Sequence, residues 1–595
     1  MNPLRHLGLL LGAVLSATAA LGATFTVSST SDAGPGSLRA AITNANATPG
    51  PNAIVFNLPV GTLTLSPLTA LPALTNMVTV DGATQPGFAG APLVELSGAA
   101  AGGGAASGLR LATSNSVIRG LVVNRWRASG IEITGGRSNV VEGCFIGTGA
   151  SGTNDLGNAN NGILIVDSPG NRIGGTDTAQ RNVISGNEDH GVRINGTNSV
   201  GTQILGNFIG LDVTGTADLG NTDHGILLDR AVETMIGAAT PAAGNVISGN
   251  NGHGIRVEGA GGRRAVIRSN RIGLDASGLA DLGNNLDGIS IVNSPQSVVG
   301  GPGVGNLVSG NGGAGLRLDG ANTTNTTVLG NRFGTDTTGV RGITNNGAGI
   351  EIAGNARFNQ IGGLGEGEGN GVAFSGADGV FVGSGTNNAV RGNTHHSNVG
   401  LGLDLGSNGV QNNDASDADT GANQLQNFPV LRRGVLGDGS VEVQGELRST
   451  PGTTFAVDLF ASGAADASGN GEGEQFLGTF EVTTDGAGFV RFTHALPVVT
   501  TRRFLTATAT DPSGNTSEFS PALRALTTLP ANVFVVTIAA DAGPGSLRQA
   551  LTDANAAFNL GDRITFHVPG TGPQTIAVAS ALPAIGAPVT LDGFT

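Results

Sequence analysis

The chain has 595 residues, of which 101 are glycine and 39% are hydrophobic. So much glycine disfavours helices, whereas the apolar content is too high for a disordered linker. All 30 basic residues are arginine against 44 acidic residues, and the sequence contains neither lysine nor tyrosine. A net charge of −14 without a basic run argues against nucleic acid or an anionic membrane surface as the partner.

The first 23 residues have the pattern of an export signal. Arg5 precedes an apolar run, and small residues near Ala20 and Ala23 suit cleavage. We interpret residues 1–23 as a signal peptide and expect a secreted or cell-surface protein. No later apolar run is long enough for a membrane span.

Residues 24–100 read as a cap followed by the first strands. The stretch DAGPGSLRAAITNAN (32–46) supplies a Pro-Gly turn, an N-cap at Ser37 and a short amphipathic helix. A helix laid over the first coil would cover the exposed end of a stack of strands. The strands AIVFNL and TLTL follow, ending at VDGATQPG.

A repeat of glycine followed by alternating apolar residues runs through residues 101–431. It begins with GLRLA at 108 and GIEIT at 130 and ends with GLGLD at 400, with a shortest period of about 22 residues. Inserts lengthen alternate units, so that a two-coil unit of about 63 residues is duplicated. Each coil holds three short period-2 strands, which can bury their faces only by stacking on like coils. The repeat therefore predicts an all-β parallel β-helix of about eleven coils with three strands per coil.

One asparagine recurs between the second and third strands of eight consecutive coils. Asparagine tolerates the left-handed backbone of a sharp corner, and stacked amides can hydrogen-bond along the axis. The preceding coil has Cys144 at the aligned position, which we interpret as a turn or core substitution. The predicted ladder comprises Asn182, Asn207, Asn245, Asn270, Asn306, Asn331, Asn370 and Asn393.

After residue 431 the pattern changes. Residues 432–526 contain longer strands with turns between them and predict an Ig-like β-sandwich module. Residues 527–595 comprise a linker, TTLPA, and a second DAGPGSLR string at 541–548; residues 534–593 repeat residues 25–82 in order. We interpret this segment as the truncated start of a second β-helix, and the chain as a fragment of a longer protein.

These motifs together resemble bacterial secreted right-handed parallel β-helix repeat proteins of the pectin-lyase-like superfold. The resemblance is carried by DAGPGSLR, VDGATQPG, GNFIGLDVTGTADLGN, GNVISGN, DADTGANQLQNFPVL and TATATDPSGNTSEF. The DAGPGSLR segment is similar to the CSLREA-type N-terminal segment of these proteins. Here the string is GPGSLRAA, which lacks the Cys and the Glu of that segment. The resemblance implies a right-handed coil, on a fold that hosts lyases, hydrolases, adhesins and passive stalks.

The position before the strand glycine carries four candidate catalytic residues, and an aspartate lies beside each of the first two. Stacking would place them on one edge, as acid/base groups or as a metal site. NTD at 221–223 and GHG at 252–254 resemble fragments of polygalacturonase motifs, but that family's other motifs are missing, and drift of the repeat on a solvated turn explains the same residues. The candidates are Asp189, His190, Asp223, His224, His253 and Asp287.

Other groups suggest ligands as well. Asp414, Asp417 and Asp419, and the series Asp466, Ser468 and Asn470, place oxygens at alternate positions as calcium loops do, although the same residues make ordinary turns. No cofactor is required, and a structural Ca²⁺ is the ion these residues could hold. The basic group Arg263, Arg264, Arg268 and Arg271 could meet an acidic glycan, but also reads as a solvated face.

The sequence favours a structural or adhesive scaffold that binds extracellular glycan or cell-surface components. The alternative is a polysaccharide lyase or glycoside hydrolase acting on an acidic polysaccharide. The lyase mechanisms that use Lys or Tyr as the base are excluded by composition. The scarcity of aromatic residues, with Trp126 as the only tryptophan, disfavours tight sugar stacking.

Overall fold

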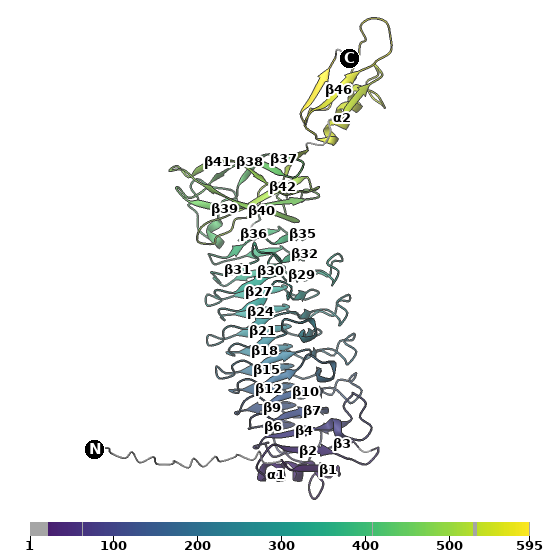
Figure 1. Ribbon diagram of the computed structural model, residues 1–595, viewed down its shortest axis with the longest axis vertical. Helices are drawn as coiled ribbons and strands as arrows, with labels where there is room; N and C mark the ends of the chain where they lie inside the picture. The colour runs from purple at the N-terminus through teal and green to yellow at the C-terminus, as the bar shows by residue number, and fades with distance from the viewer. Residues whose placement is uncertain (1–21, 62, 407–408, 528–531, 594–595) are drawn as a thin grey trace, which may run out of the picture.

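The structure is a computed structural model that describes residues 22–61, 63–406, 409–527 and 532–593. The signal peptide expected over residues 1–23 lies outside these ranges except for its last two residues, and most of the TTLPA linker lies outside them too. The described chain forms a rod of stacked coils with a sandwich at one end and a smaller unit beyond it (Figure 1). No described helix combines the length and hydrophobicity that crossing a membrane requires.

Three long parallel sheets build the rod, and successive coils contribute one strand to each. This arrangement is a right-handed parallel β-helix and confirms the fold class predicted from the sequence. Sheet 1 contains β1 (Thr24–Val27), β2 (Asn52–Phe56), β4 (Val78–Asp81), β7 (Val117–Arg119), β10 (Val140–Glu142), β13 (Arg172–Gly174), β16 (Gln203–Leu205), β19 (Met235–Ile236), β22 (Val266–Ile267), β25 (Val298–Gly300), β28 (Thr327–Leu329), β31 (Gln360–Ile361) and β34 (Ala389–Val390).

Sheet 2 contains β3 (Thr64–Leu65), β5 (Val94–Ser97), β8 (Leu121–Asn124), β11 (Phe145–Ile146), β14 (Val183–Ile184), β17 (Phe208–Ile209), β20 (Val246–Ile247), β23 (Arg271–Ile272), β26 (Leu307–Val308), β29 (Arg332–Phe333), β32 (Gly371–Ala373) and β35 (Thr394–His396). Sheet 3 contains β6 (Leu109–Leu111), β9 (Ile131–Thr134), β12 (Ile163–Val166), β15 (Val192–Asn195), β18 (Ile226–Asp229), β21 (Ile255–Glu258), β24 (Ile289–Val292), β27 (Leu316–Asp319), β30 (Ile350–Ala353), β33 (Val380–Val382) and β36 (Leu403–Leu405). These eleven strands correspond to the eleven repeats of the sequence.

The alternating repeat explains the register of sheet 3. Ile163 lies between Ile131 and Val192 in the neighbouring coils, and all three side chains are fully buried. The preceding glycine is required by the close approach of the coils. A Cβ added at Gly191 would lie 2.7 Å from the carbonyl oxygen of Gly225, closer than real Cβ atoms come.

The two ends of the rod are covered differently. At the N-terminal end lies α1 (Leu38–Ala47), whose cap Ser37 accepts a hydrogen bond from the N–H of Ala40 and whose apolar face is buried, as predicted. At the other end the sandwich packs directly on the last coil, where Phe519 belongs to the same apolar core as Leu405. The short 3-10 helices are η1 (Gly82–Thr84), η2 (Thr178–Gln180), η3 (Pro241–Ala243) and η4 (Ala422–Leu425).

The sandwich consists of two four-stranded sheets around one apolar core. One sheet contains β37 (Val430–Leu436), β38 (Val441–Arg448), β41 (Phe489–Leu496) and β44 (Leu526–Thr527), and the other β39 (Thr454–Ser462), β40 (Gln475–Thr483), β42 (Phe504–Thr510) and β43 (Leu523–Arg524). Because β37 begins at Val430, the boundary placed after residue 431 falls inside this strand.

The last unit repeats the cap of the rod. It contains β45 (Val533–Val536), α2 (Leu547–Ala557), β46 (Asp562–Phe566) and β47 (Val589–Asp592), with the three strands parallel. The Arg39 guanidinium donates to the carbonyl oxygens of Thr69 and Ala70, and the Arg548 guanidinium donates in the same way to those of Ser580 and Ala581. The two DAGPGSLR strings therefore fold alike.

Candidate functional site

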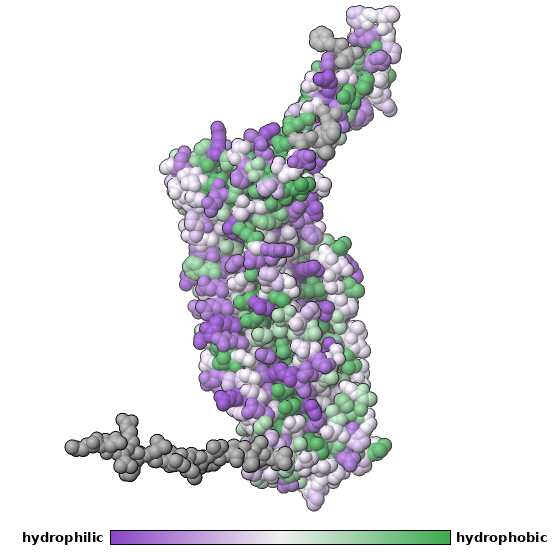
Figure 2. Space-filling model, viewed as in Figure 1, coloured by the Kyte–Doolittle hydropathy of each residue, from purple (hydrophilic) through white to green (hydrophobic). Residues whose placement is uncertain are grey.

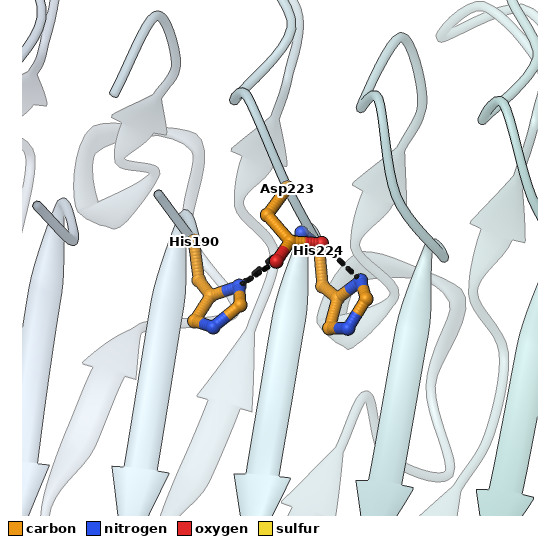
Figure 3. Close-up of side chains that lie close together, drawn as sticks. All are labelled: His190, Asp223 and His224. Atoms are coloured by element: carbon orange, nitrogen blue, oxygen red, sulfur yellow. Dashed lines mark hydrogen bonds and ion pairs between the residues drawn. The ribbon is translucent and has the colours of Figure 1, made fainter. Parts of the chain in front are cut away.

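The six candidate catalytic residues lie in one column beside sheet 3, at the corner where each coil turns into its strand. We call this set the His–Asp column; its members are Asp189, His190, Asp223, His224, His253 and Asp287. Parallel stacking brings equivalent residues of successive coils together, although the coils are 29 to 34 residues apart in sequence. Figure 3 shows two of the rings side by side with one carboxylate between them.

The three imidazole rings are stacked along the axis. The ring centroids of His190 and His224 are 5.0 Å apart with an interplanar angle of 18°. The centroids of His224 and His253 are also 5.0 Å apart, at 45°. The rings thus follow the spacing of the strands, about 4.8 Å, and leave little room between them.

A hydrogen bond to the next coil occupies each Nδ1 atom. The backbone N–H of His224 donates to His190 Nδ1 at 3.3 Å, and that of His253 donates to His224 Nδ1 at 3.1 Å. The series continues as the N–H of Asp287 donates to His253 Nδ1 at 3.1 Å, and the N–H of Ala314 to Asp287 Oδ1 at 2.8 Å. These side chains therefore join successive coils and satisfy backbone groups at a buried corner.

Carboxylates approach the same ring nitrogens. Asp223 Oδ1 lies 2.8 Å from His224 Nδ1, and Asp223 Oδ2 lies 3.7 Å from His190 Nδ1. Asp189 Oδ1 lies 3.4 Å from His190 Nε2. A neutral His224 can either accept from the backbone or donate to Asp223 through Nδ1, but one tautomer cannot do both.

Burial keeps the His190 and His224 rings neutral. The pKa of His224 is lowered to about 3, first because the ring is desolvated and then because His190, His253 and Arg256 disfavour a further positive charge. The pKa of His190 is also lowered, since desolvation outweighs the attraction of Asp189 and Asp223. A base with a pKa so far below neutral pH accepts protons poorly at pH 7.

The end of the column near His253 offers a different environment. Asp287 Oδ2 lies 3.3 Å from His253 Nδ1, and Arg256 Nη1 lies 3.1 Å from His253 Nε2. Arg256 also forms an ion pair with Glu258 at 2.6 Å. A carboxylate, an imidazole and a guanidinium thus meet at one place on sheet 3.

The column could also hold a cation. One ligand atom each from His190, Asp223 and His224 lie within 4.8 Å of one another, and two imidazoles with a carboxylate suit a transition metal. Binding through His224 Nδ1 would require the lone pair that now accepts the N–H of His253. A cation there would therefore compete with the contact between coils.

The asparagine ladder is continuous through the eight coils in which the sequence places it. Each Nδ2 donates to Oδ1 of the next asparagine at 2.8 to 3.0 Å, from Asn182 to Asn393. A second ladder that the sequence analysis missed runs through Asn158, Asn187, Asn221, Asn250, Asn284, Asn311 and Asn345. Its signal was present, since most of these residues follow a glycine in LGN or SGN.

Cys144 occupies the start of the first ladder. Its backbone N–H donates to Asn182 Oδ1 at 2.9 Å, and its side chain is fully buried. Burial raises the pKa of the Cys144 thiol to about 12. Because the thiolate is the reactive form, this residue has a structural role.

The two candidate calcium sites differ. Ligand atoms of Asp414, Asp417 and Asp419 lie within 4.8 Å of one another. Both oxygens of Asp417 already accept hydrogen bonds, from Asn427 N–H at 3.0 Å and from Ser449 Oγ at 2.6 Å, and burial raises the pKa of Asp417 to about 6.

At the second site, Asp466 Oδ1 accepts from the N–H of Ser468, and Asn470 donates to the carbonyl oxygen of Phe519. These contacts are those of a turn. A calcium ion at either site stays a prediction.

The arginines of the predicted basic group have different surroundings in the structure. Arg264 forms an ion pair with Glu233, and Arg268 Nε donates to the carbonyl oxygen of Gly300 at 3.0 Å. Arg271 lies on β23 in sheet 2. Trp126 is buried, and its Nε1 donates to the carbonyl oxygen of Leu96, so this ring is part of the core.

Comparison with known proteins finds similarity only in the path of the backbone. No family model matches the sequence, and no curated protein matches it. Among solved structures, the Dettilon tailspike protein has a TM-score of 0.37 and 14% identity, over 83% of this chain and 94% of that one.

The periplasmic alginate epimerase AlgG has a TM-score of 0.30 and 13% identity, over 59% of this chain and 76% of that one. The A-module of the Azotobacter vinelandii mannuronan C-5 epimerase AlgE4 has a TM-score of 0.25 and 14% identity, over 65% of this chain and 98% of that one. The β-helix assignment rests on the strand registers described above.

Proposed function

We propose that the protein is a rigid β-helical scaffold, exported to the cell exterior, that binds extracellular glycan and does no chemistry at the His–Asp column. The observation that carries the proposal is the use of Nδ1 in His190, His224 and His253 as acceptors for the backbone of the next coil. Imidazoles whose Nδ1 atoms are engaged in this way hold coils together rather than transfer protons, and desolvation also keeps His190 and His224 neutral.

The surface around the column fits a binding role better than a catalytic role in a deep cleft. The imidazole rings of the column are mostly covered, with 6% of the His190 side chain and 12% of the His224 side chain exposed, whereas the side chains of Asp189 and Asp223 are 34% and 45% exposed. Figure 2 shows hydrophilic and hydrophobic side chains interspersed along the rod on the face in view. A rod with two continuous asparagine ladders and covered ends presents such a surface without changing shape.

A second candidate function is hydrolysis or lyase cleavage of an acidic polysaccharide. It is favoured by the meeting of Asp287, His253 and Arg256, which provides a carboxylate, an imidazole and a cation within hydrogen-bonding distance. Such a group could serve as acid or base beside a uronate carboxylate.

One experiment separates the two. The mature protein is incubated with a panel of uronic-acid and neutral glycans, with and without calcium, and new reducing ends and unsaturated products are measured. We expect binding without product formation. Turnover that disappears in a His253→Ala variant would establish the enzyme instead, and a protein that neither binds nor cleaves any glycan would contradict both.

A further inference from the structure

The outward face of sheet 2 changes character halfway along the rod. The outward position of alternate coils is Phe145 in β11 and Phe208 in β17, but Arg271 in β23 and Arg332 in β29. The registers place these residues in one column, separated by the coils of β14, β20 and β26. The duplicated unit has thus exchanged a phenyl ring for a guanidinium in two successive copies.

The phenylalanine half of the column is closed. Only 6% of Phe145 and 5% of Phe208 is exposed, because the inserts of the repeat fold over them. Val213 packs on Phe145, and Ala276 packs with Leu282 on Phe208. This half is a small apolar core and offers no binding surface.

The arginine half is open and contains a cavity of about 300 Å³. Arg271 and Arg332 flank Leu307, the residue paired with both in the register of sheet 2. The lining also includes Pro241, Ser269 and Thr337, together with Asn270, Asn306 and three glycines. The cavity therefore combines two guanidinium groups with an apolar wall.

These two arginines have no acidic partner among the residues that the structure describes. No ion pair joins a carboxylate to Arg271 or Arg332 in that part of the chain, and the cavity lining includes neither Asp nor Glu. Arg332 Nη1 donates instead to the carbonyl oxygen of Thr337 at 3.1 Å. By contrast, Arg317 on sheet 3 pairs with Asp319 and Glu351. In a chain of net charge −14, two unneutralised cations in one cavity mark a place for an anionic ligand.

The spacing sets the size of that ligand. Arg271 and Arg332 lie two strands apart, which is about 9.6 Å along the axis at the usual strand separation. Planar guanidinium groups bind carboxylates and sulfates through paired hydrogen bonds. A ligand that engages both needs two anionic groups about that far apart, as alternate units of an acidic saccharide chain provide, since each pyranose unit spans about half that length.

We propose that the cavity between Arg271 and Arg332, hereafter the arginine cleft, binds an acidic oligosaccharide through its carboxylate or sulfate groups. Leu307 and Pro241 lie against the apolar face of a sugar ring, and Ser269 and Thr337 offer hydroxyl groups at the margin. The inference rests on the proposed function, which supplies the glycan, and it places binding on sheet 2 rather than at the His–Asp column.

The test uses the full chain and calorimetric titration with three probes: an oligogalacturonide, a heparin-derived sulfated oligosaccharide and a neutral cello-oligosaccharide. The variants are Arg271→Gln, Arg332→Gln and the double variant, with Arg137→Gln, an exposed arginine far from the cleft in sequence, as the matched control. Circular dichroism melting checks that each variant is folded.

We expect wild type and Arg137→Gln to bind at least one acidic probe equally and the neutral probe not at all. Each single variant should weaken binding, and the double variant should weaken it at least tenfold, with the loss shrinking as salt is raised. Unchanged binding by the double variant would show that the glycan binds elsewhere. That result would contradict the proposal for the arginine cleft but not the proposed function. If wild type binds no acidic probe, the proposal for the arginine cleft is wrong. If wild type binds no glycan at all, the glycan-binding part of the proposed function is wrong as well.

Discussion

Arg391 in the rod and Asp458 in the sandwich form a two-point ion pair. Arg391 Nη2 lies 2.6 Å from Asp458 Oδ1, and Nε lies 3.0 Å from Oδ2, while the Asp458 side chain is fully buried. The pair connects the coil of β34 to the middle of β39. It belongs to a junction in which Glu472 also accepts the backbone N–H groups of Ser397 and Asn398.

Substitution Arg391→Gln should loosen this junction. The variant leaves a buried carboxylate without its cation, and breaking such a pair costs about 3–5 kcal/mol. The expected result is a less stable sandwich with an unchanged β-helix. Pulse proteolysis in urea measures it, whereas fluorescence of Trp126 reports on the rod. The double variant Arg391→Gln/Asp458→Asn should recover part of the loss; a single variant as stable as wild type would contradict the prediction.

Substitution Asn245→Ala should destabilise the rod at its centre. The Asn245 side chain donates to the carbonyl oxygen of Ile204 and to Asn270 Oδ1, and its Oδ1 accepts both the backbone and side-chain N–H groups of Asn207. Each buried polar group left unsatisfied costs about 1–3 kcal/mol. Thermal melting measures the loss, with Asn198→Ala, an exposed asparagine, as the control. Equal melting temperatures for the two variants would show that the ladder contributes little.

The stability of the end of the rod should depend on pH through Asp404 and Glu518. Burial raises the pKa of Asp404 to about 6, with the charge of Asp378 adding to the rise, and burial raises the pKa of Glu518 to about 7, where Asp404 adds to the rise. Because both folded pKa values exceed the unfolded ones, the native state binds protons more tightly. Stability from this pair is complete below about pH 4 and is lost as pH rises through about 6 to 7.

An Asp404→Asn variant removes one member of this pair. It should melt at a higher temperature than wild type at pH 8, and its melting temperature should vary less between pH 5 and pH 8. Melting curves of the two proteins across this range, compared at each pH, provide the measurement. A parallel pair of curves would contradict the assignment to these carboxyls.

The thiol of Cys144 should be inert in the folded protein. Its pKa is raised to about 12 by burial, so the reactive thiolate is scarce at pH 7. A maleimide reagent should leave the native protein unlabelled and label it fully in denaturant, as mass spectrometry would show. Rapid labelling of the native protein would mean that the coil around Cys144 opens.

The features that could be predicted from the sequence are those that recur with its repeat. The strands of sheet 3, the helix after Ser37 and the first asparagine ladder recur at fixed positions, so each copy supports the interpretation of the next. Contacts between unlike parts carry no such signal. Glu472 and Asn398 are 74 residues apart, and their partnership follows only from how the sandwich packs on the last coil. The packing of the sandwich as the end cover was accordingly missed.

The site was predictable to the same extent. Stacking of His190, His224 and His253 follows from the repeat, whereas the engagement of their Nδ1 atoms depends on the corner geometry. The exchange of Phe208 for Arg271 is visible in aligned repeats, but its meaning depends on knowing that this position faces outward on sheet 2. An insert buries the ring of Phe208, whereas Arg271 is half-buried and Arg332 is exposed at the equivalent positions, which composition alone does not reveal.

The two-coil unit makes the length of the rod adjustable. Inserts stack on one another every second coil, as when the N–H of Val213 donates to the carbonyl oxygen of Gly152 and that of Ala276 to Gly215. Gain or loss of a whole unit changes the rod by two strand spacings, about 9.6 Å, and keeps every ladder in register. Gain of a single coil would set two like coils side by side and interrupt the insert stack. Whole units are therefore the increments by which such a protein can change its reach without redesigning its surface.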